Sequence, residues 1–200
     1  MNIQPSDLKK LFWPLVAGAV AGVVWYRRRQ FDARVAETTA AFERGVPPYA
    51  LDESPSVRRQ ALRRALRHRD RRVRREAAEA LRYEGPEAAP DLILALRDED
   101  PWVRVAAAGA LGELRVSEAV PALIKALEDR EWPVRADAAL ALGRIRDPEA
   151  VPALAVRLQD EDALVRDEAA WALRQIGTSE ALEALQHIPK QSHSGKESHR

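Results

Sequence analysis

Hydrophobic residues in the middle of the chain follow a pattern that repeats about every thirty residues. A Val-Arg pair recurs with spacings of 30, 31 and 31 residues, at Val73-Arg74, Val103-Arg104, Val134-Arg135 and Val165-Arg166. A leucine stands eight residues after each valine, at Leu81, Leu111, Leu142 and Leu173. Another stands eleven residues before it, at Leu62, Leu92, Leu123 and Leu154. Agreement of several positions at one period predicts a solenoid of repeated units.

Each unit divides into two predicted helices. In the third copy, Val134, Ala138, Leu142 and Ile145 fall at the spacing of one helix face. Asp147-Pro148 interrupts this stripe, and a second one runs through Val151, Leu154 and Leu158. A single helix pair cannot bury its apolar face alone, so neighbouring pairs are expected to stack and share a core. The pattern predicts an all-α fold.

Two phrases identify the type of repeat. Residues 129–143 are DREWPVRADAALALG, and EAVPAL occurs at both 118–123 and 149–154. These phrases resemble the HEAT family, in particular the short HEAT-like repeats first noted in phycobilisome lyases. The resemblance covers residues 56–188 and implies an α-solenoid of about four and a half helix pairs, in which SVRRQALRRAL at 56–66 is the second helix of a partial repeat.

The resemblance implies protein binding, with a lyase or chaperone acting on a chromophore-bearing protein as the alternative. Some HEAT-repeat enzymes, the deoxyhypusine hydroxylases, hold a di-iron centre through His-Glu pairs. No His-Glu pair occurs in this chain, so that activity is not implied.

An acidic residue precedes each repeat arginine by four positions, as in Asp100–Arg104 and Glu131–Arg135. We interpret the acid as a helix N-cap and the arginine as one rung of a structural ladder, paired with acids of its own and adjacent repeats. A charged binding stripe is the alternative. The ladder arginines are Arg74, Arg104, Arg135 and Arg166.

Residues 11–26, LFWPLVAGAVAGVVWY, contain no charge. As a helix they would span roughly 24 Å, slightly less than the ~30 Å hydrocarbon core of a bilayer. They predict a single-pass transmembrane anchor; a cleaved signal peptide and a buried soluble helix are the alternatives. Because Arg27, Arg28, Arg29 and Arg34 outnumber Lys9 and Lys10, we expect the repeats in the cytoplasm. Gly18 and Gly22 form a small-residue motif that suggests a homodimer through this helix.

The predicted organisation has five parts. Residues 1–10 form a short tail, 11–26 the anchor, 27–55 a juxtamembrane helix with a Pro/Gly linker, 56–188 the solenoid, and 189–200 a disordered polar tail.

Charge divides the chain into unlike parts. Residues 1–75 carry 17 Lys/Arg and 7 Asp/Glu, a net charge of +10, whereas residues 76–188 carry 12 and 23, a net charge of −11. Ten arginines lie within residues 57–75. A polar end cap of the solenoid, contact with anionic lipid and nucleic-acid binding all remain open, but the block lacks stacking aromatics and any nucleic-acid motif, which disfavours the last. The candidate membrane-surface residues are Arg58, Arg59, Arg63, Arg64 and Arg67.

No catalytic, metal or cofactor site is predicted. The chain has no cysteine, and its four histidines lack metal-ligand spacing. Trp102 and Trp132, at the start of first helices in successive repeats, are candidate partner-binding residues, although packing against the preceding unit is the alternative. Lys125 and Arg157, on second helices, are candidates for electrostatic selection of the partner. The sequence therefore predicts a non-enzymatic, membrane-anchored scaffold that presents a right-handed solenoid to protein partners.

Overall fold

The computed structural model describes residues 27–46 and 54–186. Every regular element in these residues is helical, which confirms the all-α prediction for this part of the chain. No helix among the described residues is long and apolar enough to cross a membrane. The predicted anchor at 11–26, with Gly18 and Gly22, lies outside the described residues.

The chain divides into two compact units, Met1–Ala65 and Leu66–Arg200. In the first unit, residues 27–43 form one helix and α2 (Pro55–Ala65) forms another. Val35, Val57 and Ala61 are buried together, with Phe31 packed against them. The second helix of the predicted partial repeat thus packs on the helix formed by residues 27–43. Arg64 lies 3.9 Å from Asp32 in the same unit.

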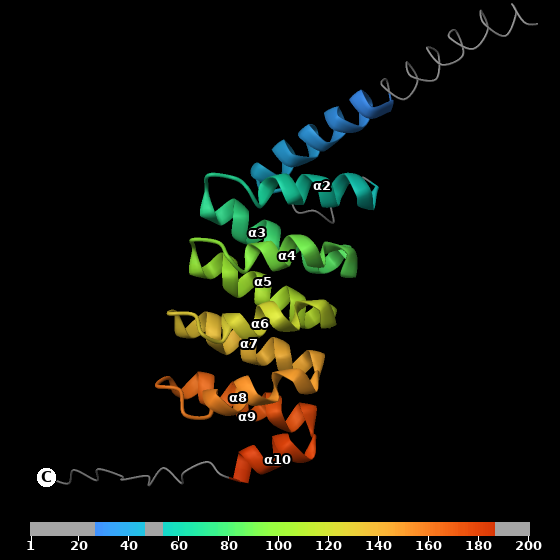
Figure 1. Cartoon of the computed structure of the whole chain (residues 1–200). Coiled ribbons are helices and arrows are strands. Elements are labelled where there is room, and N and C mark those ends of the chain that lie inside the picture. The colour runs from blue at the N-terminus through green and yellow to red at the C-terminus, as the bar shows by residue number, and fades with distance from the viewer. Residues whose placement is uncertain (1–26, 47–53, 187–200) are drawn as a thin grey trace, which may run out of the picture. The chain divides into compact units, whose positions relative to one another are not determined.

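The second unit is a stack of four helix pairs, as the repeat pattern predicts (Figure 1). In each pair a longer first helix is followed by a shorter second helix. The first helices are α3 (Arg71–Leu81), α5 (Pro101–Leu114), α7 (Trp132–Ile145) and α9 (Ala163–Ile176). The second helices are α4 (Ala89–Ala95), α6 (Val120–Ala126), α8 (Val151–Arg157) and α10 (Ser179–Gln186).

Local signals set the ends of these helices. The side chains of Asp70, Asp100 and Asp162 cap α3, α5 and α9 by accepting a hydrogen bond from the backbone N–H two residues on. Glu131 precedes α7 but makes no such bond. A short 3₁₀ turn precedes each of α4, α6 and α8, and a proline in the first turn of these helices occupies a position that needs no N–H donor.

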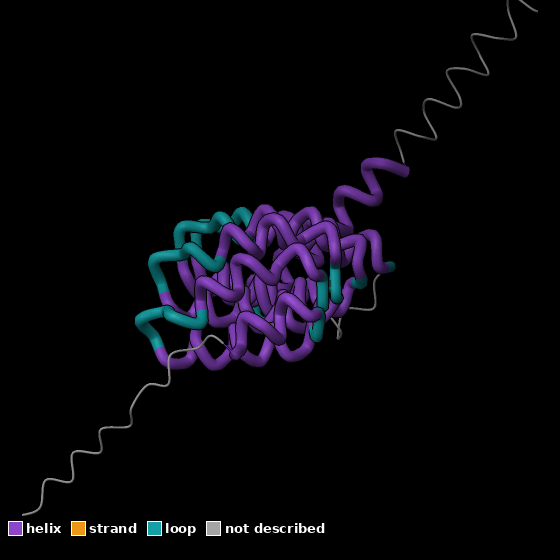
Figure 2. Tube along the Cα trace, turned by 60° about the horizontal axis from the view of Figure 1, so that its bottom comes forward, coloured by secondary structure: helices purple, strands orange, loops and turns teal. Residues whose placement is uncertain are grey.

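The repeated leucines form the core between the helices. Leu81, Leu111, Leu142 and Leu173 from the first helices are fully buried, as are Leu92, Leu123 and Leu154. Consecutive first helices pack directly on one another, α3 on α5, α5 on α7 and α7 on α9. Loops that connect each second helix to the next first helix gather along one side of the stack (Figure 2). This loop side positions the site described next.

Candidate functional site

The three loops that precede α5, α7 and α9 carry an acidic residue at the first and third of three equivalent positions. The sequences are Asp98-Glu99-Asp100, Asp129-Arg130-Glu131 and Asp160-Glu161-Asp162. The carboxylate of the first acid accepts a hydrogen bond from the backbone N–H of the third residue, at 2.9–3.1 Å. This bond fixes the orientation of the first carboxylate, both oxygens of which face the preceding repeat.

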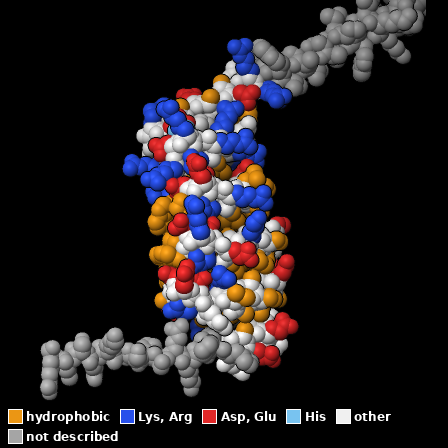
Figure 3. Space-filling model, turned by 60° about the vertical axis from the view of Figure 1, so that its left-hand side comes forward, with side chains coloured by type: hydrophobic (Ala, Val, Ile, Leu, Met, Phe, Trp, Pro, Cys, Tyr) orange, Lys and Arg blue, Asp and Glu red, His pale blue; other side chains and the backbone are white. Residues whose placement is uncertain are grey.

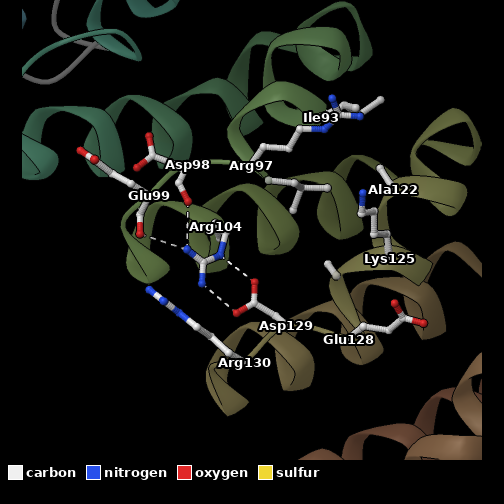
Figure 4. A pocket seen from close by; sticks show the side chains of 12 residues that line it. Ile93, Arg97, Asp98, Glu99, Arg104, Ala122, Lys125, Glu128, Asp129 and Arg130 are labelled. Atoms are coloured by element: carbon white, nitrogen blue, oxygen red, sulfur yellow. Dashed lines mark hydrogen bonds and ion pairs between the residues drawn. The ribbon is translucent and has the colours of Figure 1, made fainter.

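A buried arginine joins each loop to its neighbour. Arg104 donates from Nε and Nη2 to the two oxygens of Asp129, both at 2.7 Å, and from Nη1 to the backbone carbonyls of Asp98 and Glu99 (Figure 4). Arg74 binds Asp98, and Arg135 binds Asp160, in the same way. The three arginines are only 5–7 % exposed. We call each such unit, one arginine with its carboxylate, a rung.

Of the predicted partners, which are acids of its own and of adjacent repeats, each rung arginine binds one in the loop that leads into the next repeat. Each arginine contacts the acid 24 or 25 residues later and not the acid four residues earlier. The earlier acid is instead occupied as a helix cap, as Asp100 is by the backbone N–H of Trp102. The aspartate at i−4 of Arg74, Arg104 and Arg166 therefore caps the start of a helix, while the arginine of each rung joins two repeats.

The carboxylates of Asp129 and Asp160 stay ionised at neutral pH. Burial raises the pKa of Asp129 and Asp160. The hydrogen bonds from Arg104 and Arg135, a backbone N–H bond and the nearby positive charges together outweigh it, so the pKa of both carboxyl groups lies below its usual value. The fourth ladder arginine, Arg166, binds the backbone carbonyls of Asp160 and Glu161 but pairs with no carboxylate among the described residues.

Open cavities lie beside the rungs. One of 580 Å³ is lined by Arg104 and Asp129 and by Ile93, Arg97, Ala122 and Lys125 (Figure 4). The next along the stack, of 510 Å³, is lined by Arg135, Val156 and Arg157. Arg97 and Lys125 are exposed and form no ion pair with any residue the structure describes. The cavities thus combine apolar walls with cations available to a ligand.

The predicted partner-binding residues lie on two different sets of helices, the first helices and the second helices of the repeats. Lys125 lies on α6, and Arg157, the last residue of α8, donates to the carbonyl of Leu127 and to Asp160. Trp102 and Trp132 lie in the first turns of α5 and α7, where they are 53 % and 45 % exposed. The structure does not place these tryptophans in the cavity that holds Lys125.

The sequence-based predictions do not include two apolar residues that lie exposed on second helices. Leu94 on α4 and Val156 on α8 are each 60 % exposed. Both stand two residues after the buried leucine of their second helix, the position that Lys125 takes in α6. The sequence does contain a signal for their exposure, because the equivalent position of another repeat holds a charged residue, Lys125.

The predicted membrane-surface arginines lie in or just after α2. Arg63, Arg64 and Arg67 are exposed, and Arg58 and Arg59 are half-buried. They lie in the segment with which the predicted solenoid begins. Within the second unit, Lys and Arg side chains become fewer toward the α9–α10 end (Figure 3).

No cluster of three or more His, Cys, Asp or Glu side chains that could hold a metal ion occurs among the described residues. His68 is described, whereas His187, His193 and His199 lie outside these residues. The site therefore consists of fixed charges, hydrogen-bonded rungs and open apolar cavities, an arrangement suited to binding.

Comparison with known proteins decides the family. The sequence profile described as HEAT repeats matches residues 60–130, 89–166 and 120–195. The chain belongs to the HEAT-repeat family. A search of curated proteins gives no significant match.

Solved HEAT-type structures are similar to this HEAT-repeat chain. The complex of CpcE and CpcF of phycocyanin lyase from Nostoc sp. gives a TM-score of 0.59 at 28 % identity, covering 70 % of this chain and 61 % of that one. Human deoxyhypusine hydroxylase in complex with glycerol gives 0.54 at 32 % identity, covering 63 % and 44 %. A designed armadillo repeat protein in complex with the peptide (KR)4 gives 0.50 at 20 % identity, covering 84 % and 85 %, and shows the fold alone. The chain thus spans less than two thirds of the first two structures. These likenesses support a HEAT-repeat protein of the phycobilisome-lyase-like type.

Proposed function

We propose that this HEAT-repeat protein is a non-enzymatic adaptor that binds protein partners along the second helices and the loop side of its stack. The observation that carries the proposal is the row formed by Leu94, Lys125 and Val156, one exposed residue at the same position of α4, α6 and α8. Exposed apolar side chains next to available cations and open cavities are typical of protein-binding surfaces. An extended partner could contact all three repeats at once.

The test compares partner capture by the intact protein and by a surface variant. The double variant Leu94→Asp and Val156→Asp places charge at two exposed positions, so we expect an unchanged melting temperature and at least a tenfold loss of the protein crosslinked in cells, because the partner's apolar contacts are lost. Leu182→Asp, on the 47 % exposed Leu182 of α10, is the matched control because it adds a charge away from the row. Equal capture by all three proteins would refute the proposal.

We also propose that residues 11–26 tether the adaptor to the cell membrane as a single-pass helix with the repeats in the cytoplasm. The uncharged run of 16 residues and the arginines that follow it support this assignment. The full chain is expected in the membrane fraction, and a shortened chain that begins at Asp52 in the soluble fraction. Recovery of both as soluble proteins would contradict a tether. Gly18→Leu with Gly22→Leu would reduce a homodimer if the two glycines pack helix on helix.

The arginines of α2 would then lie a short distance along the chain from the bilayer. Each basic residue near an anionic surface contributes about 1 kcal/mol. Replacement of Arg63, Arg64 and Arg67 by Gln is expected to weaken binding of the Asp52-start chain to phosphatidylserine vesicles and to leave phosphatidylcholine vesicles unaffected. Replacement of Arg97, Arg130 and Arg146 by Gln, three exposed arginines of the stack, is the control.

A second candidate function rests on the likeness to the phycocyanin lyase structure. In that case the partner is a chromophore-bearing protein, and the adaptor acts as a lyase or chaperone toward it. Visible absorbance that co-purifies with the protein, and that the Leu94/Val156 variant loses, would favour this candidate over a general adaptor.

A further inference from the structure

The three complete rungs show which hydrogen bonds an arginine makes at this position, and Arg166 can be compared with them. In all three, Nη1 of the arginine binds the carbonyls of its own preceding loop at 2.9–3.3 Å. The remaining edge, Nε with Nη2, binds both oxygens of one aspartate at 2.7–2.9 Å. The carbonyls hold the guanidinium, and the carboxylate fills the edge that is left.

Arg166 makes the first half of this arrangement. Its Nη1 donates to the carbonyl oxygens of Asp160, at 2.7 Å, and Glu161, at 3.0 Å. The same two carbonyl positions hold Nη1 in the completed rungs, at slightly longer distances, so the guanidinium of Arg166 is already held in the orientation that binds a carboxylate elsewhere in the stack. Within the described residues, no acid meets its Nε–Nη2 edge. The neighbouring acids are engaged: Asp162 caps α9, and Glu161 pairs with Arg135.

We propose that Arg166 is a receptor for one carboxylate of a protein partner, at the α9–α10 end of the stack. The proposal deepens the proposed function and rests on it. A planar, bidentate guanidinium edge that is fixed before binding selects a carboxylate and loses little conformational entropy on association. Leu164, 46 % exposed and two residues away, offers an apolar contact beside the charge.

Alignment of the loop before α3 with the rung loops argues against a second copy of this chain as the ligand. In the loop that precedes α3, the position that corresponds to Asp98, Asp129 and Asp160 is His68. The backbone N–H of Asp70 donates to Nδ1 of His68, as the N–H of Asp100 does to Asp98. Arg67 and Arg69 flank His68. This end of a second copy therefore presents no carboxylate at the rung position, since Asp70 of that loop caps α3, and an acidic loop of a different protein is the fitting ligand.

The test uses the full ¹⁵N-labelled chain and the arginine Nε–Hε signals in NMR spectra, with the Arg166 signal identified by its loss in Arg166→Lys. The probe is the acetylated and amidated peptide LQDEDA, which copies residues 158–163. We expect a saturable shift of the Arg166 signal and no shift of Arg104 or Arg135, whose edges are filled. The peptide LQNQNA, which has the same length and no carboxylate, should cause no shift. Arg166→Lys should weaken binding of LQDEDA at least tenfold, whereas Arg174→Lys, a matched loss of an exposed guanidinium on the same helix, should not.

Two results would overturn the proposal. One is an Arg166 signal that does not move while signals of exposed arginines do. The other is a signal that already has the position of the filled rungs without peptide and keeps it, because the chain then fills its own site. Neither result bears on the Leu94/Val156 capture experiment, which tests the proposed function independently of Arg166.

Discussion

At the scale of single residues, the rungs are buried charges that depend on their partners. Arg135 and Asp160 are 5 % and 8 % exposed, and Arg135 Nη2 lies 2.7 Å from Asp160 Oδ1. Removing one member of a buried pair leaves the other charge without compensation. We expect Arg135→Ala to lower the free energy of unfolding by about 3–5 kcal/mol, measured by urea denaturation. Arg174→Ala, at an exposed position of α9, should change it by less than about 0.5 kcal/mol. A similar small loss for both would mean that the rungs add little to stability.

Asp137 on α7 lies in surroundings that disfavour its ionised form. Burial, with a further contribution from the charge of Glu168, raises its pKa from 3.8 to about 6. The folded state therefore binds a proton more readily than the unfolded state, and stability falls as pH rises from about 4 to about 6. Because Asp137 is partly exposed, we expect Asp137→Asn to stabilise the protein by about 1 kcal/mol at pH 8, after a discount for solvent screening. The gain should vanish at pH 4, where Asp137 is protonated in the folded state.

Thermal melting at both pH values checks this expectation. Glu149→Gln, at an exposed position in the same repeat, is the control and should show no comparable gain at pH 8. A stabilisation by Asp137→Asn that is the same at pH 4 and pH 8 would show that loss of the charge is not its cause.

At the scale of helices, two glycines distinguish close packing from open space. A Cβ on Gly143 of α7 would lie 2.6 Å from Cζ3 of Trp171 and 2.7 Å from Cα of Ala172, both on α9. A Cβ on Gly109 of α5 would meet only Oδ1 of Asp137, at 3.8 Å. We expect Gly143→Ala to cost about 1–3 kcal/mol, because α9 must move away. Gly109→Ala should instead stabilise by roughly 0.5–1 kcal/mol, because alanine is the better helix former.

The pair of variants shares one chemical change, so the difference between their melting temperatures isolates the packing of α7 on α9. Equal effects in both would show that the helices can separate at no cost. Trp171 accordingly lies over the preceding repeat at Gly143.

At the scale of the whole stack, each helix pair depends on its neighbours. α7 packs between α5 and α9 and buries eight of its residues, whereas α10 packs on α8 and α9 and buries Ala181 alone. In a quasi-one-dimensional stack, helices with one neighbouring pair open more readily than helices with two. We expect amide hydrogens of α10 to exchange roughly a hundredfold faster than those of α7, by hydrogen–deuterium exchange and mass spectrometry. Equal rates would mean that the stack opens as one cooperative unit.

The sequence predicts the stack well because its signals are local. The helix periodicity, the capping aspartates and the prolines of the second helices each act within a few residues, and the repeated leucines identify the buried faces. Of the site, the sequence marks the arginine of each rung and the cations Lys125 and Arg157. It indicates partners in the same and adjacent repeats for these arginines but does not identify the rung carboxylates, because these acids lie 24 or 25 residues away and no local pattern marks them.

By itself, then, the sequence determined the HEAT-repeat fold and the faces that each helix buries. About thirty residues specify one helix pair, and the same pattern of buried positions recurs in the next pair. The tertiary structure alone decided which carboxylate meets each arginine, which apolar residues stay at the surface, and that Arg166 keeps an edge free of any carboxylate in the described residues. The physical reason is distance along the chain: these contacts join loops 24 or 25 residues apart, and only the stacking of one repeat on the next brings them within hydrogen-bonding range.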